Sequence, residues 1–100
     1  YEVDFSGNRN MCLDATGGTA AAGVKLEQWG CNGGGNQRWF FQPKGGGYYA
    51  IASSQNQNLV ATVGGATDGS GNPVIELQPS TGAANQLWKL NQLGIVYLHG

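Results

Sequence analysis

The sequence is poor in charge and contains no long apolar segment. Only 11% of its 100 residues are charged and the net charge is −1, so no basic stripe attracts a nucleic acid and no Lys/Arg cluster attracts an acidic membrane surface. No apolar run reaches the ~18 residues of a membrane-spanning helix. The chain also does not open on the basic and apolar segments of a secretory signal. If the protein is secreted, we expect that its signal has already been removed.

Histidine and cysteine are scarce, which restricts the chemistry of the chain. His99 is the single histidine and lies at the end, so no Ser/His/Asp or Cys/His arrangement indicates nucleophilic catalysis. Cys12 and Cys31 are the two cysteines, and with one histidine they do not provide the four ligands of a zinc site. We predict a disulfide worth roughly 3 kcal/mol, which is typical of an extracytoplasmic location. The alternative is two independent buried thiols.

Glycine and uncharged polar residues are abundant, with 18 glycines in the chain. No helical period persists for three turns, whereas short apolar runs alternate with loop residues. Turns or loops are expected at 7–10, 33–35, 53–58 and 68–73. The predicted strands are 1–5, 11–15, 24–29, 39–41, 48–52, 59–63, 74–77, 87–90 and 94–98.

An internal repeat organises the chain. The pattern Asn-Gln-x-Trp occurs at 36–39 and again at 85–88, 49 positions further on. Other segments repeat around it: 12–18 resembles 59–65, and 24–27 resembles 74–77. Such self-similarity predicts a repeated structural unit before any single residue is interpreted.

Four strands per repeat, with Gln-x-Trp in the last, resemble the ricin B-chain type β-trefoil, a lectin or carbohydrate-binding module. The resemblance covers nearly the whole chain; it is strongest in the first repeat and degraded in the second. It implies an all-β fold, a β-trefoil of two four-stranded repeats plus the first strand of a third. We expect one lectin-like domain over 1–100, with repeat one at 1–44, repeat two at 45–91 and the start of repeat three at 92–100.

The family domain has about three full repeats, and this chain departs from that pattern. Without the remaining strands, a sheet edge and part of the core would be uncovered. Either the sequence is a fragment, or another chain supplies the rest, or two copies complete each other. The sequence does not choose among these.

Asp14 and Trp29 are the main candidate sugar-binding residues. The resemblance implies that Asp14 accepts hydrogen bonds from two adjacent sugar hydroxyls, as an ionised carboxylate can; the alternative is an Asp that caps a turn. Trp29 stands at the family's stacking position, where an indole packs against the C–H face of a sugar; the alternative is a core Trp. Strand alternation places Trp29 on the same face as Lys25 and Glu27, which favours exposure.

Three further residues complete the candidate site. Glu27 either accepts a hydrogen bond from another sugar hydroxyl or is a solvated strand residue. Glu76 aligns with it in the second repeat, which is compatible with a role in the fold alone. The resemblance implies that Asn36 donates to a sugar hydroxyl and that Gln37 holds the site in place. The same Asn, Gln and core Trp recur in the second repeat, at 85–88. A purely structural role for Asn36 and Gln37 is therefore the alternative.

The second repeat serves as an internal control. Ala61 aligns with Asp14 and Gln78 with Trp29, so both the carboxylate and the stacking plane are absent. Only Asn85 is retained, and we predict a second site that is weak or inactive. Leu59 and Ser80 stand near the positions of the two cysteines.

One other segment resembles a metal-binding motif. Asp68, Ser70 and Asn72 are spaced like the start of a calcium loop, but Pro73 and Pro79 occupy the positions that require Gly and Glu. A hairpin loop is therefore predicted, with no metal and no cofactor.

The function predicted from the sequence is carbohydrate binding at one shallow site, by a secreted, extracellular protein. The family suggests galactose or N-acetylgalactosamine as the ligand. Asp14 and Glu27 resemble a glycosidase acid/base pair, but that chemistry needs a deep cleft and a raised acid pKa, so no enzymatic activity is expected. Two alternatives stay open: a non-catalytic targeting module of a glycoside hydrolase or toxin that binds a plant or microbial polysaccharide, and a β-trefoil protease inhibitor or protein-interaction module.

Overall fold

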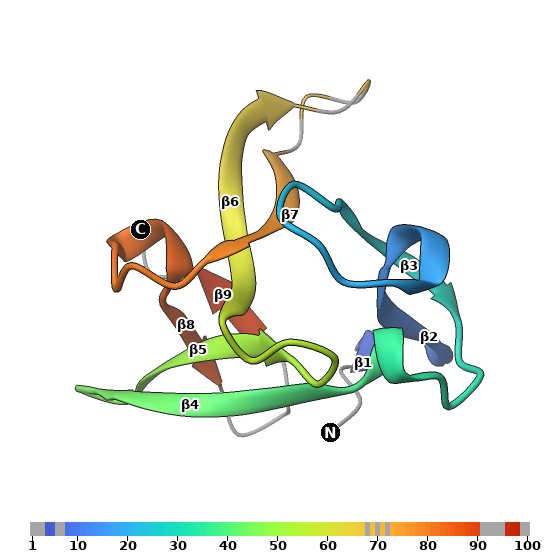
Figure 1. Ribbon diagram of the computed structural model, residues 1–100, viewed down its shortest axis with the longest axis horizontal. Coiled ribbons are helices and arrows are strands. Elements are labelled where there is room, and N and C mark those ends of the chain that lie inside the picture. Colours follow the sequence, from blue (N-terminus) through green and yellow to red (C-terminus); the bar gives the residue numbers. More distant parts are fainter. Residues whose placement is uncertain are drawn as a thin grey trace.

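The computed structural model describes residues 4–5, 8–67, 69, 71, 73–90 and 96–98. These residues form strands linked by loops and by single 3-10 turns, which are labelled η (Figure 1). In chain order the elements are β1 (Asp4–Phe5), β2 (Asn8–Ala15), η1 (Thr16–Gly18), β3 (Leu26–Gly30), η2 (Gly35–Gln37), β4 (Trp39–Gly45), β5 (Tyr48–Ser53), β6 (Leu59–Thr67), β7 (Pro73–Pro79), η3 (Ala84–Gln86), β8 (Trp88–Leu90) and β9 (Val96–Leu98).

The strands pair into two antiparallel sheets. The first contains β1, β2 and β3 in that order, and the second runs β7-β6-β5-β8-β9, with β4 also paired to β5. Figure 1 shows the β2–β3 hairpin on one side of the molecule and β8 and β9 on the other, with β6 between them. The two hairpins β2–β3 and β6–β7 are the corresponding parts of the two repeats.

Each predicted strand is confirmed in the described residues, although several bounds differ. The turn expected at 7–10 is wrong in part, because Asn8 already pairs with Phe5 and begins β2. Pro73 likewise belongs to β7 and pairs with Thr67. Three residues with the spacing of a calcium loop, for which a hairpin loop was predicted, lie outside the described residues, as does His99: Asp68, Ser70 and Asn72.

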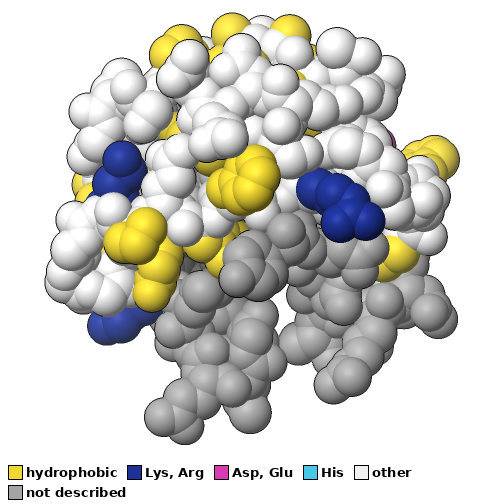
Figure 2. Space-filling view, turned by 60° about the horizontal axis from the view of Figure 1, so that its bottom comes forward, with side chains coloured by type: hydrophobic (Ala, Val, Ile, Leu, Met, Phe, Trp, Pro, Cys, Tyr) yellow, Lys and Arg dark blue, Asp and Glu magenta, His cyan; other side chains and the backbone are white. Residues whose placement is uncertain are grey.

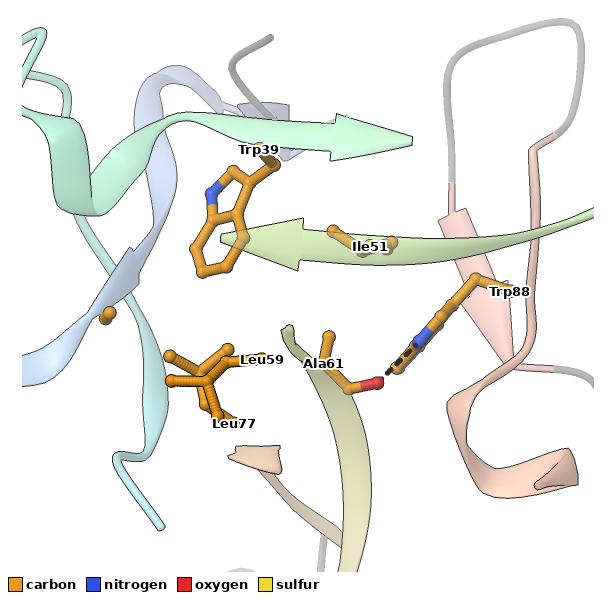
Figure 3. Close-up of a cluster of buried hydrophobic side chains, with 7 residues drawn as sticks. Trp39, Ile51, Leu59, Ala61, Leu77 and Trp88 are labelled. Carbon is orange, nitrogen blue, oxygen red and sulfur yellow. Dashed lines mark hydrogen bonds between the residues drawn. The ribbon is translucent and has the colours of Figure 1, made fainter. Parts of the chain in front are cut away.

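A buried apolar cluster joins the two repeats (Figure 3). Trp39 and Trp88 are 1% and 6% exposed, which confirms that the Trp of each Asn-Gln-x-Trp segment is a core residue. Each indole N–H also has a backbone acceptor: Trp39 Nε1 donates to the Leu13 carbonyl at 3.1 Å and Trp88 Nε1 to the Ala61 carbonyl at 3.0 Å. Burial of these large rings is therefore not opposed by an unsatisfied donor. The buried members of the cluster are Ala15, Trp39, Ile51, Leu59, Ala61, Leu77 and Trp88.

The hairpins of the two repeats also contact each other through their backbones. The Gly23 amide donates to the Leu77 carbonyl at 2.7 Å, and the Leu77 amide donates to the Val24 carbonyl at 2.8 Å. Lys25 and Glu76 form an isolated antiparallel bridge next to them. The second repeat thus supports the strand that carries Glu27 and Trp29.

Charge is sparse on the surface as well as in the sequence. On the face shown in Figure 2, the described Lys and Arg side chains lie in separate places among uncharged groups. No helix among the residues that the structure describes has the length and apolar character needed to cross a membrane.

Candidate functional site

The β2–β3 hairpin brings together three of the five predicted site residues. Asp14 pairs directly with Glu27, and Cys12 pairs with Trp29. Because side chains of paired residues lie on the same face of a sheet, Asp14, Glu27 and Trp29 share one face of the hairpin. Leu13 on the other face packs against the core. Asp14 and Trp29 are diagonal neighbours, for which a Cα separation of about 7–8 Å is typical.

A disulfide connects the hairpin to the following loop. Cys12 and Cys31 are bonded, with a Cα–Cα distance of 5.2 Å, which confirms the predicted disulfide and excludes two independent thiols. Cys12 is fully buried and lies directly across from Trp29. The cross-link therefore anchors the end of β3 that carries the Trp29 ring.

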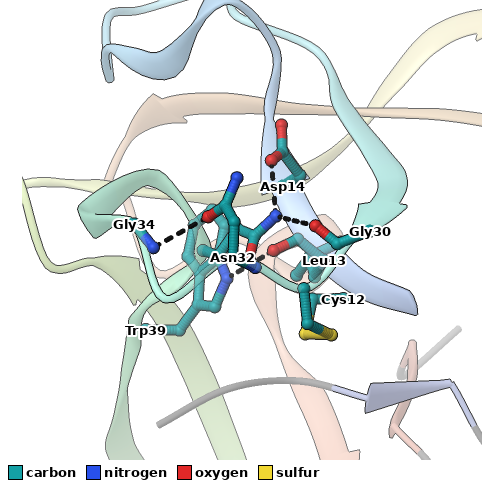
Figure 4. Close-up of a disulfide and its surroundings, with 9 residues drawn as sticks. Cys12, Leu13, Asp14, Gly30, Asn32, Gly34 and Trp39 are labelled. Atoms are coloured by element: carbon teal, nitrogen blue, oxygen red, sulfur yellow. Dashed lines mark hydrogen bonds between the residues drawn. A yellow bond between two sulfur atoms is a disulfide. The ribbon is translucent and has the colours of Figure 1, made fainter. Parts of the chain in front are cut away.

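Asp14 is a buried carboxylate held by two side-chain amides. It is only 4% exposed, and its Oδ2 accepts hydrogen bonds from Asn36 Nδ2 at 3.0 Å and from Gln37 Nε2 at 2.9 Å. Figure 4 shows Asp14 beside the disulfide, with a side-chain amide bonded to its carboxylate. Burying a carboxylate is costly unless donors compensate for lost water. Because both amides donate to Oδ2, neither of them occupies Oδ1.

η2 supplies both of these amides. Its turn is closed by two hydrogen bonds, from the Gln37 amide to the Gly34 carbonyl at 3.0 Å and from the Arg38 amide to the Gly35 carbonyl at 3.2 Å. The tight turn directs two consecutive side chains, Asn36 and Gln37, towards Asp14. Asn36 Nδ2 also donates to the Ala15 carbonyl at 3.1 Å.

Gln37 is completely buried and its amide is saturated by protein groups. Besides Asp14, Nε2 donates to the Gly30 carbonyl at 2.9 Å, and Oε1 accepts from the Asn32 amide at 2.9 Å. Gln37 is 0% exposed, so its side chain is not available for direct contact with a ligand. Asn36 is only partly buried and is the amide that reaches the surface.

Glu27 is partly buried and electrostatically coupled to Asp14. Burial raises the pKa of its carboxyl above the ordinary value of 4.5, and a hydrogen bond to Asp14 and the Asp14 charge raise this pKa further. Glu27 therefore binds a proton more readily than an isolated glutamate does. A protonated Glu27 can donate as well as accept a hydrogen bond.

Trp29 is exposed, as the strand alternation predicted. Its side chain has 56% of its surface accessible, the larger of the two values among the exposed large apolar residues described. A large exposed ring of this kind is informative, since a Trp is highly buried on average. It provides a rigid apolar platform next to the Asp14 carboxylate.

The second repeat builds the same scaffold without the same chemistry. Gln86 is buried, and its Nε2 donates to the Pro79 carbonyl at 2.9 Å and to Thr62 Oγ1 at 3.2 Å. Asn85 Nδ2 donates to the Val63 carbonyl at 3.2 Å. These bonds reproduce those of Gln37 and Asn36, with a hydroxyl in place of the carboxylate.

These hydrogen bonds correct one sequence alignment by one position. Thr62 corresponds to Asp14, because each accepts the buried Gln amide, so the prediction that Ala61 corresponds to Asp14 is wrong. The strand register confirms the other two equivalences, since Thr62 pairs with Glu76 and Val60 pairs with Gln78. Val60, rather than Leu59, therefore corresponds to Cys12.

Two features of the site were not found from the sequence. Asn32 stabilises the loop before η2, because its side-chain oxygen accepts from the Gly34 backbone amide at 2.8 Å and its own backbone amide donates to Gln37 Oε1. Its place after Cys31 in a Gly-rich loop was the available signal. The turn at Ser54 and Gln55 reaches the site from the second repeat, and no local pattern in the sequence indicates this long-range contact.

The comparisons with known proteins agree with this geometry. A family model described as a ricin-type beta-trefoil lectin domain-like family matches residues 5–77. The chain therefore belongs to this family of lectin-like domains, and the membership supports carbohydrate binding in general. No curated protein matches the chain.

Several solved structures are similar, and three of them are compared with this chain. ThreeFoil, a designed three-fold symmetric protein, has 25% identity and a TM-score of 0.78; the match covers 94% of this chain and 65% of that chain. A mosquitocidal holotoxin has 21% identity and a TM-score of 0.75; the match covers 96% of this chain and 12% of the holotoxin chain. The exo-beta-1,3-galactanase 1,3Gal43A from Clostridium thermocellum has 30% identity and a TM-score of 0.66; the match covers 89% of this chain and 21% of the galactanase chain. With the family match, these show that the fold is an all-β β-trefoil.

Proposed function

We propose that the chain binds carbohydrate at one site on the first repeat. Asp14 accepts hydrogen bonds from sugar hydroxyls, and the apolar face of the sugar packs on Trp29. Both Nδ2 hydrogens of Asn36 are already donated to Asp14 and Ala15, so Asn36 contributes its side-chain oxygen as an acceptor instead of the donor expected from the resemblance. Glu27, which pairs with Asp14, adds a further polar contact to the sugar. The buried Gln37 fixes the Asp14 carboxylate through its hydrogen bond. The observation that carries the proposal is the exposed Trp29 ring on the same hairpin face as a buried, amide-braced carboxylate.

The two groups suit a sugar because a sugar has both polar edges and an apolar face. A charged acceptor gives stronger hydrogen bonds than a neutral one, and the indole removes C–H surface from water. The second repeat offers Thr62 and Gln78 at the equivalent positions. We therefore propose that its site is inactive or much weaker.

Galactose or N-acetylgalactosamine is the proposed ligand type. The suggestion comes from the family, and the similar exo-beta-1,3-galactanase is an enzyme of galactose polymers by its description. A single shallow site of this kind has an affinity near the millimolar end of the scale. Useful retention on a glycan then depends on several sites acting together.

We propose a binding role without catalysis, outside the cell. The disulfide between Cys12 and Cys31 suits an oxidising compartment. Targeting within a larger glycoside hydrolase or toxin is the second candidate, because the matched regions make up 21% of the galactanase and 12% of the holotoxin. In either case a further repeat is proposed to complete the three-repeat domain, whether it belongs to a longer chain of which this sequence is a fragment, to another chain or to a second copy.

A glycan array followed by calorimetric titration tests the proposal. We expect wild-type protein to bind galactose-type glycans with millimolar affinity, and Asp14→Ala and Trp29→Ala each to abolish the signal. Gln28→Ala is the matched control, because Gln28 is an exposed neighbour of Trp29 on the opposite face of β3. The proposal fails if no glycan binds at millimolar concentration, or if both site variants bind as wild type does.

A further inference from the structure

The turn between β5 and β6 reaches across from the second repeat to the site on the first. Gln55 in this turn makes two side-chain hydrogen bonds, one to the last residue of η1 and one to the segment that follows it. Its Oε1 accepts from the Ala20 amide at 2.8 Å, and its Nε2 donates to the Gly18 carbonyl at 2.9 Å. One amide side chain therefore fixes both ends of a short loop that is 35 to 37 positions away in sequence.

The same turn also holds η2. Ser54 Oγ donates to the Gly35 carbonyl at 2.9 Å, and the Ser54 amide donates to the Arg38 carbonyl at 3.1 Å. The Gln55 side chain lies over Gly35, where an added Cβ would stand 3.5 Å from its Cγ and Nε2. Ser53 helps to orient Gln55, because the Ser53 hydroxyl accepts a hydrogen bond from the backbone amide of Gln55 at 3.1 Å. Figure 1 shows the turn between β5 and β6 extending towards η2.

The two segments that this turn connects flank the proposed sugar site. Asp14 lies two positions before η1, and η2 contains Asn36 and Gln37. η1 includes Gly17 and Gly18, both with φ of +82°, and glycine leaves a loop with more conformational freedom than any other residue. Ordering such a loop when a ligand binds costs conformational entropy. An anchor that already holds the loop in the free protein reduces this cost.

We propose that Gln55 is a positioning residue for the sugar site of the first repeat, contributed by the second repeat. Gln55 fixes the segment after η1 relative to η2 and so pre-organises Asp14 and Asn36. This inference rests on the proposed function and adds that one repeat alone does not make a full-strength site.

Three variants of the full chain test this positioning role. Gln55→Ala removes both hydrogen bonds, and Gln55→Glu retains the acceptor for Ala20 but loses the donor to Gly18. Gln57→Ala is the matched control, because Gln57 is an exposed glutamine of the same turn that contacts Gln42 through its backbone carbonyl, which the substitution keeps. The measurements are the Kd for galactose and N-acetylgalactosamine, well below the melting temperature, and the hydrogen exchange rate of the Ala20 amide.

We expect Gln55→Ala to raise the Kd about three- to tenfold, since two modest hydrogen bonds are lost, and to accelerate exchange at Ala20. Gln55→Glu should keep Ala20 protected and give an intermediate Kd, and Gln57→Ala should change neither quantity. If Gln55→Ala lowers only the melting temperature while the Kd stays at the wild-type value, the positioning role is refuted. If wild-type protein itself binds neither sugar, the proposed ligand type fails instead, and the faster exchange at Ala20 still reports on the anchor.

Discussion

Replacing Asp14 by Thr should separate stability from sugar binding. The second repeat already performs this exchange, since Thr62 accepts the buried Gln86 amide where Asp14 accepts the Gln37 amide. Thr is thus an acceptor that the scaffold tolerates at this position. The same substitution removes the negative charge on which the proposed sugar contact depends.

The expected loss of stability is small. A hydrogen bond to a charged group contributes about 1.5–3 kcal/mol and one to a neutral group about 0.5–1.5 kcal/mol, so the weaker acceptor for Gln37 costs about 1 kcal/mol. Asn36 keeps the Ala15 carbonyl as a partner and is partly exposed to water. Removal of the repulsion between Asp14 and Glu27 offsets part of the cost. A net loss of about 1–2 kcal/mol lowers the melting temperature by about 4–16 °C at this chain length.

The expected loss of binding is larger in proportion. If the carboxylate contributes about 1.5–3 kcal/mol to hydroxyl recognition, its removal weakens the affinity about 10- to 100-fold. Thermal unfolding and calorimetric titration with galactose measure the two effects on the same sample. Unchanged affinity in Asp14→Thr would show that Asp14 is not the sugar acceptor. A loss of more than about 4 kcal/mol in stability would instead refute the equivalence with Thr62.

Three further predictions concern the same hairpins. Cys12→Ala with Cys31→Ala should lower the free energy of unfolding by about 3 kcal/mol in urea denaturation, and a reductant should do the same to wild type; a loss below about 1 kcal/mol would contradict the estimate. The folded-state pKa of Glu27 is raised above 4.5, so its stabilising contribution is present below pH 4.5 and is lost as the pH rises through the raised value. Glu27→Gln should therefore be more stable than wild type at pH 7, with the difference shrinking towards pH 4.5; a difference independent of pH refutes the coupling. Finally, Thr62→Asp combined with Gln78→Trp should create a second sugar site, seen as a rise in stoichiometry from one to two, and a stoichiometry that stays at one would show that more than these two side chains distinguishes the repeats.

The sequence pattern predicted the strands and the repeat, because both repeats carry the same periodic signals, and the resemblance to the ricin-type family supplied the β-trefoil. Alternation predicted the strands, and the recurrence of Trp39 and Trp88 identified two core positions. The exposure of Trp29 also followed from alternation, since it shares a strand face with charged residues. Strand positions and the face on which a side chain lies follow from the alternation of neighbouring residues, so they can be predicted from the sequence.

The remaining features depend on contacts that spacing does not encode. The Gly-Gly pair in both repeats favoured an alignment of Ala61 with Asp14, and only the partner of the buried Gln86 amide shows that Thr62 is the equivalent residue. The anchoring role of Gln55 arises from residues 35 to 37 positions away. A glutamine in a polar turn has no sequence signature for such a role.

The most direct test of a single sugar site in the first repeat is a ¹H–¹⁵N NMR titration of the wild-type chain with galactose or N-acetylgalactosamine. The account predicts saturable shifts at the Trp29 indole and the Asn36 side-chain amide, with the equivalent Asn85 amide unmoved. Equal shifts at Asn36 and Asn85, or shifts confined to other surfaces, would contradict it.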